Sequence, residues 1–141
     1  MLPVRAIDRL KAELGPLVDD AAITLQAYAR DATPEFNALP DAVVFPRSTE
    51  DVVRVVRIAR ESGTPVIVRG GGSNLCAATV PLSGGIILST SRMTTIKQVS
   101  TSELLAVVEP GVTTAALDTA AAAQGLLFPP DPGSRTVSTI G

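Results

Sequence analysis

The fold is decided by residues 42–75, which read AVVFPRSTEDVVRVVRIARESGTPVIVRGGGSNL. The apolar run at residues 42–46 ends near proline and is typical of a short buried strand. An S-x-x-D pattern at Ser48 predicts the start of a helix, and Gly63 predicts its end. Residues 66–68 then give a second apolar strand. A strand, a helix and a strand within about 27 residues predict a βαβ unit with parallel strands and a right-handed crossover.

The helix of this unit is expected to be amphipathic. Its apolar residues at i, i+3, i+4 and i+7 are Val52, Val55, Val56 and Ala59. This spacing places them on one helical face, with arginines on the other faces. We therefore expect these four residues to form the buried face.

Further elements are expected on both sides of the unit. Helices are predicted at residues 3–14, 21–29 and 114–124, the last capped by Thr113, and strands at residues 86–89, 96–99 and 104–108. The fold class is α+β, a small βαβ-containing sheet packed with helices. Residues 1–40 are expected to form an N-terminal helical segment, and residues 41–141 the main domain.

Composition excludes several classes of function. The chain has 141 residues, 12 basic and 14 acidic side chains, one cysteine, and neither histidine nor tryptophan. The lack of basic excess argues against nucleic-acid binding. The lack of histidine and the single cysteine exclude a Ser-His-Asp triad, a zinc hydrolase and a cysteine-rich zinc site.

Charge is unevenly distributed along the chain. Residues 1–70 carry 9 basic and 10 acidic residues, 19 charges in all, whereas residues 71–141 carry 3 and 4, only 7. The second half therefore resembles a surface covered by a large ligand, by more chain or by a partner subunit. The alternative is an inner layer of strands.

Signals for targeting are not found in the sequence. The N-terminus lacks the apolar block of a signal peptide. The uncharged run at residues 70–91 contains glycines, an asparagine and a proline, so we interpret it as loop and strand rather than a membrane span. One cysteine fits a reducing, cytoplasmic location.

A glycine-rich segment follows the strand at residues 66–68 and is the first candidate site. It comprises Arg69, Gly70, Gly71, Gly72, Ser73, Asn74 and Leu75. Three glycines allow main-chain N–H groups to converge as a concave nest for a diphosphate. The third glycine of G-x-G-x-x-G is replaced by leucine, and no G-K-[ST] is present, so neither a Rossmann fingerprint nor a P-loop applies. The alternative is a flexible turn.

Two later segments are weaker candidates. Glu109-Pro110-Gly111-Val112 lies at a strand end, where glycine permits close approach to a flat ligand. Residues 128–134 (FPPDPGS) are stiffened by prolines and precede residues 138–141 (STIG). Each can also be an ordinary turn. Cys76 is expected to be a small buried hydrophobe.

These segments, in this order, resemble a known family. The motifs are residues 39–75, VPLSGGIILSTSRM at 80–93, VEPGVT at 108–113, GLLFPPDPGS at 125–134, and STIG. Residues 28–141 are similar to FAD-linked oxidases of the vanillyl-alcohol oxidase and p-cresol methylhydroxylase type, most of all glycolate oxidase FAD-binding subunits and D-lactate dehydrogenases. The resemblance implies the first subdomain of a p-cresol methylhydroxylase-type FAD-binding domain.

The resemblance also implies a site and an activity. Residues carried over by position as FAD-binding are Arg69, Gly70, Gly71, Gly72, Ser73, Asn74, Leu75, Pro110, Gly111, Pro130, Asp131, Ser134, Ser138, Thr139 and Gly141. The implied function is the FAD-binding portion of an oxidoreductase that oxidises a small 2-hydroxy acid, of glycolate or D-lactate type, by hydride transfer to flavin. The alternative is a non-catalytic nucleotide-binding or interaction module that needs a partner chain.

Two departures from the family pattern bear on this expectation. Ala77-Ala78 stand where the family has paired glycines, and the chain stops at the first glycine of the usual STIGG. Substrate-binding and catalytic histidines and arginines of the family lie beyond that point. We therefore expect a truncated portion that binds flavin weakly or not at all and has no activity alone.

Overall fold

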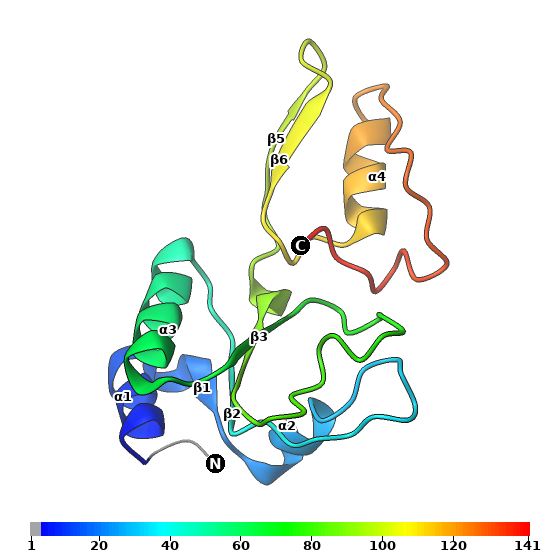
Figure 1. Cartoon of the computed structure of the whole chain (residues 1–141). Coiled ribbons are helices and arrows are strands. Elements are labelled where there is room, and N and C mark those ends of the chain that lie inside the picture. Colours follow the sequence, from blue (N-terminus) through cyan, green and yellow to red (C-terminus); the bar gives the residue numbers. More distant parts are fainter. Residues whose placement is uncertain (1–3) are drawn as a thin grey trace.

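The computed structural model describes residues 4–141, which form two lobes joined near residue 93 (Figure 1). The sheet lobe contains α1 (Val4–Leu14), η1 (Gly15–Leu17), β1 (Val18–Asp19), α2 (Ala22–Ala27), β2 (Ala42–Val44), α3 (Thr49–Ser62), β3 (Val66–Arg69), β4 (Ile86–Ser89) and η2 (Thr90–Arg92). The hairpin lobe contains β5 (Ile96–Ser100), β6 (Leu105–Val108) and α4 (Thr114–Ala122). The α+β class expected from the sequence, a small βαβ-containing sheet packed with helices, is confirmed. Pro3, expected at the start of the first helix, lies outside the described residues.

The sheet lobe is built on four strands in the order β1-β2-β4-β3. β2 and β3 are parallel, as predicted, but each pairs with β4 rather than with the other. Ile86 of β4 is in register with Ala42 on one side and Val66 on the other. β1 adds an antiparallel edge next to β2. The βαβ crossover therefore leaves one strand position open, and β4 fills it.

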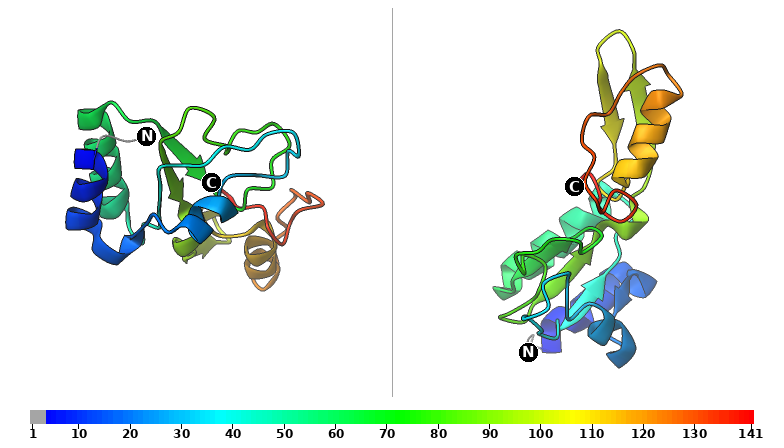
Figure 2. Two further views of the ribbon diagram at one scale, coloured as in Figure 1. Left: turned by 90° about the horizontal axis from the view of Figure 1, so that it is seen from below. Right: turned by 90° about the vertical axis from the view of Figure 1, so that its right-hand side faces the viewer.

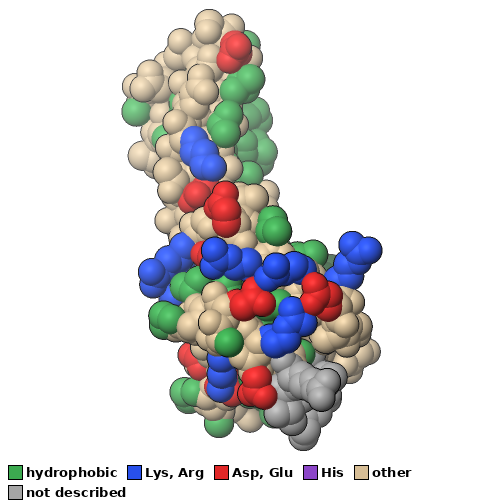
Figure 3. Space-filling view, turned by 90° about the vertical axis from the view of Figure 1, so that its left-hand side faces the viewer, with side chains coloured by type: hydrophobic (Ala, Val, Ile, Leu, Met, Phe, Trp, Pro, Cys, Tyr) green, Lys and Arg blue, Asp and Glu red, His purple; other side chains and the backbone are tan. Residues whose placement is uncertain are grey.

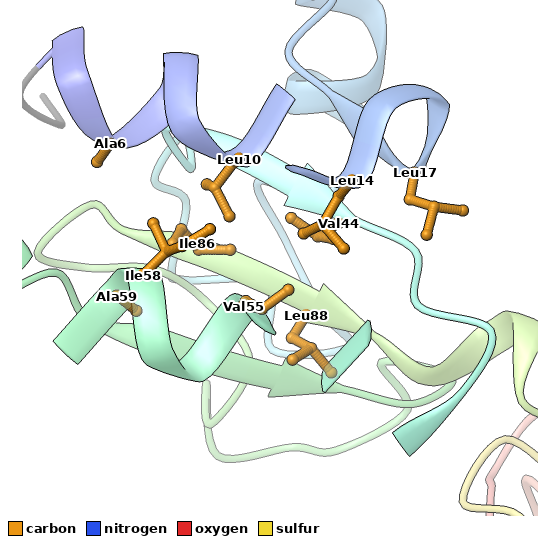
Figure 4. Packing of buried hydrophobic residues seen from close by; sticks show 10 residues of the cluster. All are labelled: Ala6, Leu10, Leu14, Leu17, Val44, Val55, Ile58, Ala59, Ile86 and Leu88. Carbon is orange, nitrogen blue, oxygen red and sulfur yellow. The ribbon is translucent and has the colours of Figure 1, made fainter. Parts of the chain in front are cut away.

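The core lies between the sheet and the helix pair α1 and α3 (Figure 4). Leu10 of α1 and Ile58 of α3 are fully buried against Ile86 of β4. The expected buried face of α3 was partly wrong, because Val56 is 49% exposed. Ile58 takes its place, since α3 must contact α1 as well as the sheet, which turns its buried face toward α1.

Both ends of α3 follow their sequence signals. The Ser48 hydroxyl accepts a hydrogen bond from the Asp51 N–H at 3.2 Å, which satisfies a free donor of the first turn. Gly63 ends the helix in the left-handed conformation, at φ +64°. α4 begins in the same way, with the Thr113 hydroxyl accepting from the Ala116 N–H at 3.2 Å. These local predictions are confirmed.

The first forty residues share the core of the sheet lobe. α1 packs against α3, and β1 extends the sheet through Val18 and Val44. The helix predicted at residues 21–29 is shorter, because α2 ends at Ala27. The domain boundary at residue 40 stays a prediction.

The hairpin lobe projects away from the sheet (Figure 2). β5 and β6 form an antiparallel hairpin, and α4 buries Leu117 and Ala121 beside it. Leu104 and Leu127 of this lobe remain 75% and 80% exposed. On the face shown in Figure 3, charged side chains gather over the sheet lobe, and hydrophobic ones follow one edge of the hairpin lobe. Within residues 4–141, no helix has the length and apolar character needed to cross a bilayer.

Candidate functional site

The candidate site is built around the glycine-rich loop, residues 70–79, which begins where β3 ends (Figure 1). In the described part of the chain, none of the five main-chain N–H groups from residue 71 to 75 donates a hydrogen bond to a protein acceptor. Gly72 has φ +67°, a conformation that favours glycine. A succession of unpaired N–H groups is available to an anion, as in the main-chain nests that bind phosphate.

Residues 71–74 of this row border a groove of about 360 Å³, the loop groove. It is lined by Val68, Gly70, Gly71, Gly72, Ser73, Asn74, Thr79, Ser138, Thr139 and Gly141. Eight of these ten residues belong to the set predicted from the sequence. Two segments separated by about sixty residues of chain thus meet in one groove.

The C-terminal segment, residues 137–141, packs directly on the glycines. A Cβ on Gly70 would lie 2.0 Å from the Thr139 hydroxyl oxygen, and one on Gly71 would lie 2.0 Å from the Val137 carbonyl oxygen. The Thr139 hydroxyl donates to the Gly141 carbonyl at 2.8 Å. Close main-chain packing, which only glycine permits, therefore forms one wall of the loop groove.

Pro110 and Gly111 lie on the other side of this segment. The Gly141 N–H donates to the Pro110 carbonyl at 2.9 Å. A Cβ on Gly111 would lie 2.1 Å from the Thr90 carbonyl oxygen, so the close approach at Gly111 is to the chain's own backbone. Pro110 and Gly141 also line a second, apolar groove of about 460 Å³, which shares Val68 and Gly141 with the loop groove.

Arg69 turns away from the loop groove. Its guanidinium lies 5.0 Å from the centre of the Tyr28 ring and donates to the Arg30 carbonyl at 2.5 Å. It also lies beneath Gly72, where a Cβ would be 2.4 Å from Nη2. Burial lowers the pKa of Arg69, although the side chain keeps its charge. In this conformation Arg69 packs against the loop at Gly72 and does not line the loop groove.

Asn74 makes hydrogen bonds within the loop, and Leu75 lies outside the loop groove, although both were predicted to bind FAD. The Asn74 amide oxygen accepts from the N–H groups of Cys76 and Ala78, at 3.3 and 3.1 Å, and so closes a turn within the loop. Leu75 is 78% exposed and does not line the loop groove. Cys76, expected to be buried, is exposed because this turn lies at the surface.

Pro130, Asp131 and Ser134 are not part of the loop groove. Pro130 and Asp131 line a separate hollow beside α4, where Asp131 lies 3.5 Å from Arg135. The Ser134 carbonyl accepts from the N–H groups of Val137 and Ser138, at 2.7 and 2.8 Å. Ser134 thus shapes the turn that delivers residues 138–141 to the groove.

Sequence reasoning missed three residues: Thr79 at the end of the loop, and Asp31 and Thr33, which make hydrogen bonds to the loop. The Asp31 carboxylate accepts from the Thr33 N–H at 2.9 Å and from the Thr79 hydroxyl at 3.1 Å. Burial raises the pKa of Asp31, but hydrogen bonds from Thr33 and Thr79 outweigh it and bring the value to about 2. The D-x-T spacing signals a local turn, but nothing local indicates the contact with Thr79, 48 residues away.

Comparison with known proteins agrees with the fold. Residues 40–141 match a family described as FAD binding domain. The chain is 41% identical over 123 residues to glycolate oxidase subunit GlcD of Bacillus subtilis, which covers 87% of the chain and 26% of that protein. It is 41% identical to D-lactate dehydrogenase of Archaeoglobus fulgidus, covering 82% of the chain and 26% of the relative. The chain thus spans about a quarter of these relatives.

Solved structures give the same result. An alkyldihydroxyacetonephosphate synthase covers 100% of the chain with a TM-score of 0.90 and 25% identity, and the match takes in 28% of the synthase. A p-cresol methylhydroxylase with bound substrate covers 95% of the chain with a TM-score of 0.83 and 26% identity, over 27% of its length. The resemblance inferred from the motifs is confirmed, and with it FAD as the cofactor of the family. The chain belongs to the FAD binding domain family.

Proposed function

We propose that this chain is the FAD-binding portion of a flavoprotein that oxidises a small 2-hydroxy acid. The observation that carries the proposal is the row of unpaired N–H groups at residues 71–74, which line the loop groove. These groups are suited to a diphosphate, which is the anionic centre of FAD. The names of the relatives, glycolate oxidase and D-lactate dehydrogenase, support the substrate class.

The two adjoining grooves support a dinucleotide rather than a simple phosphate. The loop groove offers N–H donors, whereas the apolar groove is lined by side chains such as Val52, Val56 and Met93. Val68 and Gly141 belong to both grooves. An anionic bridge with a flat ring on its flank needs this combination of a polar and an apolar surface.

The role of the described residues is to bind and orient FAD. FAD accepts a hydride when a complete enzyme oxidises its substrate. This chain has no histidine, the commonest general base, and no acid or base lines the loop groove. We therefore propose that substrate binding and proton transfer belong to residues outside this sequence, and that the isolated chain has no turnover.

The test is a titration of the purified chain with FAD and with riboflavin, followed by flavin fluorescence. We expect weak binding of FAD, because the loop groove is open to solvent, and no binding of riboflavin, which lacks the diphosphate. Reduction of a dye with glycolate or D-lactate should not exceed the rate without protein. Equal affinity for FAD and riboflavin, or no affinity for FAD up to about 1 mM, would contradict the proposal.

A second candidate is a nucleotide-binding or interaction module completed by a partner subunit. The exposed apolar residues of the hairpin lobe, Leu104 and Leu127, favour it. Such a module would bind ADP as tightly as FAD, because flavin contacts would add nothing. We also propose a partner subunit on this surface and, from the single cysteine, a cytoplasmic location.

A further inference from the structure

We propose that Asp31 is a positioning residue, which holds the glycine-rich loop in the conformation that presents its N–H groups to the loop groove. Asp31 lies outside the segment that the sequence motifs single out. The inference rests on the proposed function, since it assigns to Asp31 an effect on FAD affinity. Its first consequence, the order of the loop, can be measured without FAD.

The glycine-rich loop cannot hold this shape by itself. Three consecutive glycines lose more conformational entropy on ordering than other residues do. Ala77 has φ +54°, which costs a non-glycine residue about 1 kcal/mol. The five N–H groups of residues 71–75 gain no protein hydrogen bond in return. Contacts from elsewhere in the chain must therefore stabilise the loop.

Those contacts come from residues 30–33, which lie beside the loop in both views of Figure 2. The Ala32 N–H donates to the Gly72 carbonyl at 3.1 Å, and the Arg30 carbonyl accepts from Arg69. The Thr33 hydroxyl oxygen, in a buried side chain, accepts from the Ala77 N–H at 2.8 Å. The strained residue of the loop is thus fixed by Thr33.

Asp31 connects these contacts to the end of the loop, because it accepts hydrogen bonds from both Thr33 and Thr79. One carboxylate oxygen accepts from the Thr33 N–H at 2.9 Å and holds the turn that aims Thr33 at Ala77. The other accepts from both the N–H and the hydroxyl of Thr79, at 3.3 and 3.1 Å. The Thr79 hydroxyl in turn accepts from the Asn74 amide at 3.2 Å. A carboxylate can serve all three donors, because it only accepts.

The charge of Asp31 argues against a direct role in binding FAD. A carboxylate near a diphosphate repels it, and Asp31 does not line the loop groove. Its position is explained by the donors it holds. An asparagine at this site keeps the shape but offers one acceptor oxygen, so it must release either Thr33 or Thr79.

The experiment compares the full chain with Asp31→Asn by hydrogen exchange and by FAD titration. We expect the hydrogen-bonded amides of the loop, residues 76–79, to exchange about tenfold faster in Asp31→Asn, while those of β4 change less. The affinity for FAD should fall about tenfold, and Tm should fall by only a few degrees. Asp20→Asn is the matched control, because Asp20 is an exposed carboxylate whose ion pair, with Lys11, lies away from the loop.

Thr79 supplies a second pair of variants in case Asp31→Asn does not fold. Thr79→Val removes the hydroxyl and should speed exchange in the loop, whereas Thr79→Ser keeps it and should restore the wild-type rates. Unchanged exchange in Asp31→Asn, or exchange that rises equally in β4, overturns the inference. Faster exchange of the loop amides with an unaltered affinity for FAD also overturns the inference. If the wild-type chain does not bind FAD, the proposed function fails, and the exchange rates still decide whether Asp31 positions the loop.

Discussion

Gly71 has no room for a side chain, because a Cβ there would lie 2.0 Å from the Val137 carbonyl oxygen. Gly72 is restricted in another way, by its φ of +67° and by the Arg69 guanidinium. We expect Gly71→Val and Gly72→Val each to abolish FAD retention, since either change displaces N–H groups that line the loop groove. Titration with FAD followed by flavin fluorescence, as for the wild type, measures the effect.

Gly133 provides the matched control for these two variants. A Cβ at Gly133 meets nothing within 4 Å, so Gly133→Val should bind FAD as the wild type does. Circular dichroism should show that all three variants keep their helices. Retention of FAD by Gly71→Val at the wild-type level would contradict the role of the loop.

The glycines of the loop could be predicted from the sequence, but the orientation of their neighbours could not. Three glycines after a strand indicate a site because the backbone conformations that glycine allows do not depend on distant contacts. Arg69 points at Tyr28 and Arg30, which are about forty residues away in the chain, and no local pattern encodes that contact. Asp31 was missed for the same reason, since its partner Thr79 is distant in sequence.

At the scale of elements, the N-cap of α3 makes a quantitative prediction. The Ser48 hydroxyl satisfies the Asp51 N–H at the start of a 14-residue helix that covers the sheet. Ser48→Ala should lower the free energy of unfolding by about 1 kcal/mol. Urea denaturation followed at 222 nm measures it, with Ser83→Ala, in an exposed loop, as a control that should change little. Equal losses in both variants would show that the cap adds nothing.

The elements themselves differ in how well their sequences specify them. α3 was predicted at both ends because capping residues act within one turn. Its buried face was predicted less well, since Ile58 rather than Val56 contacts α1. The strand order could not be predicted, because residues 42–44 and 66–69 each have the length and apolar character to pair with the other as well as with β4.

At the scale of the whole molecule, the uneven charge has a structural counterpart. The charge-poor second half of the sequence supplies most of the loop groove and the whole hairpin lobe, where Leu104 and Leu127 are exposed. This half of the chain does not form an inner layer of strands. β4 is buried throughout, but the residues of β5 and β6 are half-buried or exposed. A surface of this kind is suited to burial against a ligand or further protein.

Acid unfolding of the whole chain gives the last prediction. The pKa of Asp31 falls from 3.8 to about 2 in the folded protein, so its contribution to stability is complete above the unfolded pKa and is lost as the pH falls through the folded one. Because the site is partly open to solvent, we expect about 1–2 kcal/mol rather than the full linkage value. Wild type should exceed Asp31→Asn by this amount at about pH 6, and the difference should disappear toward about pH 2.

Urea unfolding of both proteins between these pH values measures the difference. Other carboxylates with lowered pKa values, such as Asp19 and Glu109, titrate in both proteins and cancel in the comparison. The nearby charge of Arg69 does not titrate in this range, so it cannot mimic the effect. A difference that stays constant from about pH 6 to about pH 2 would mean that the Asp31 carboxylate is not held by Thr33 and Thr79. A difference that closes as the acid is added ties the conformation of the glycine-rich loop to the stability of the whole fold.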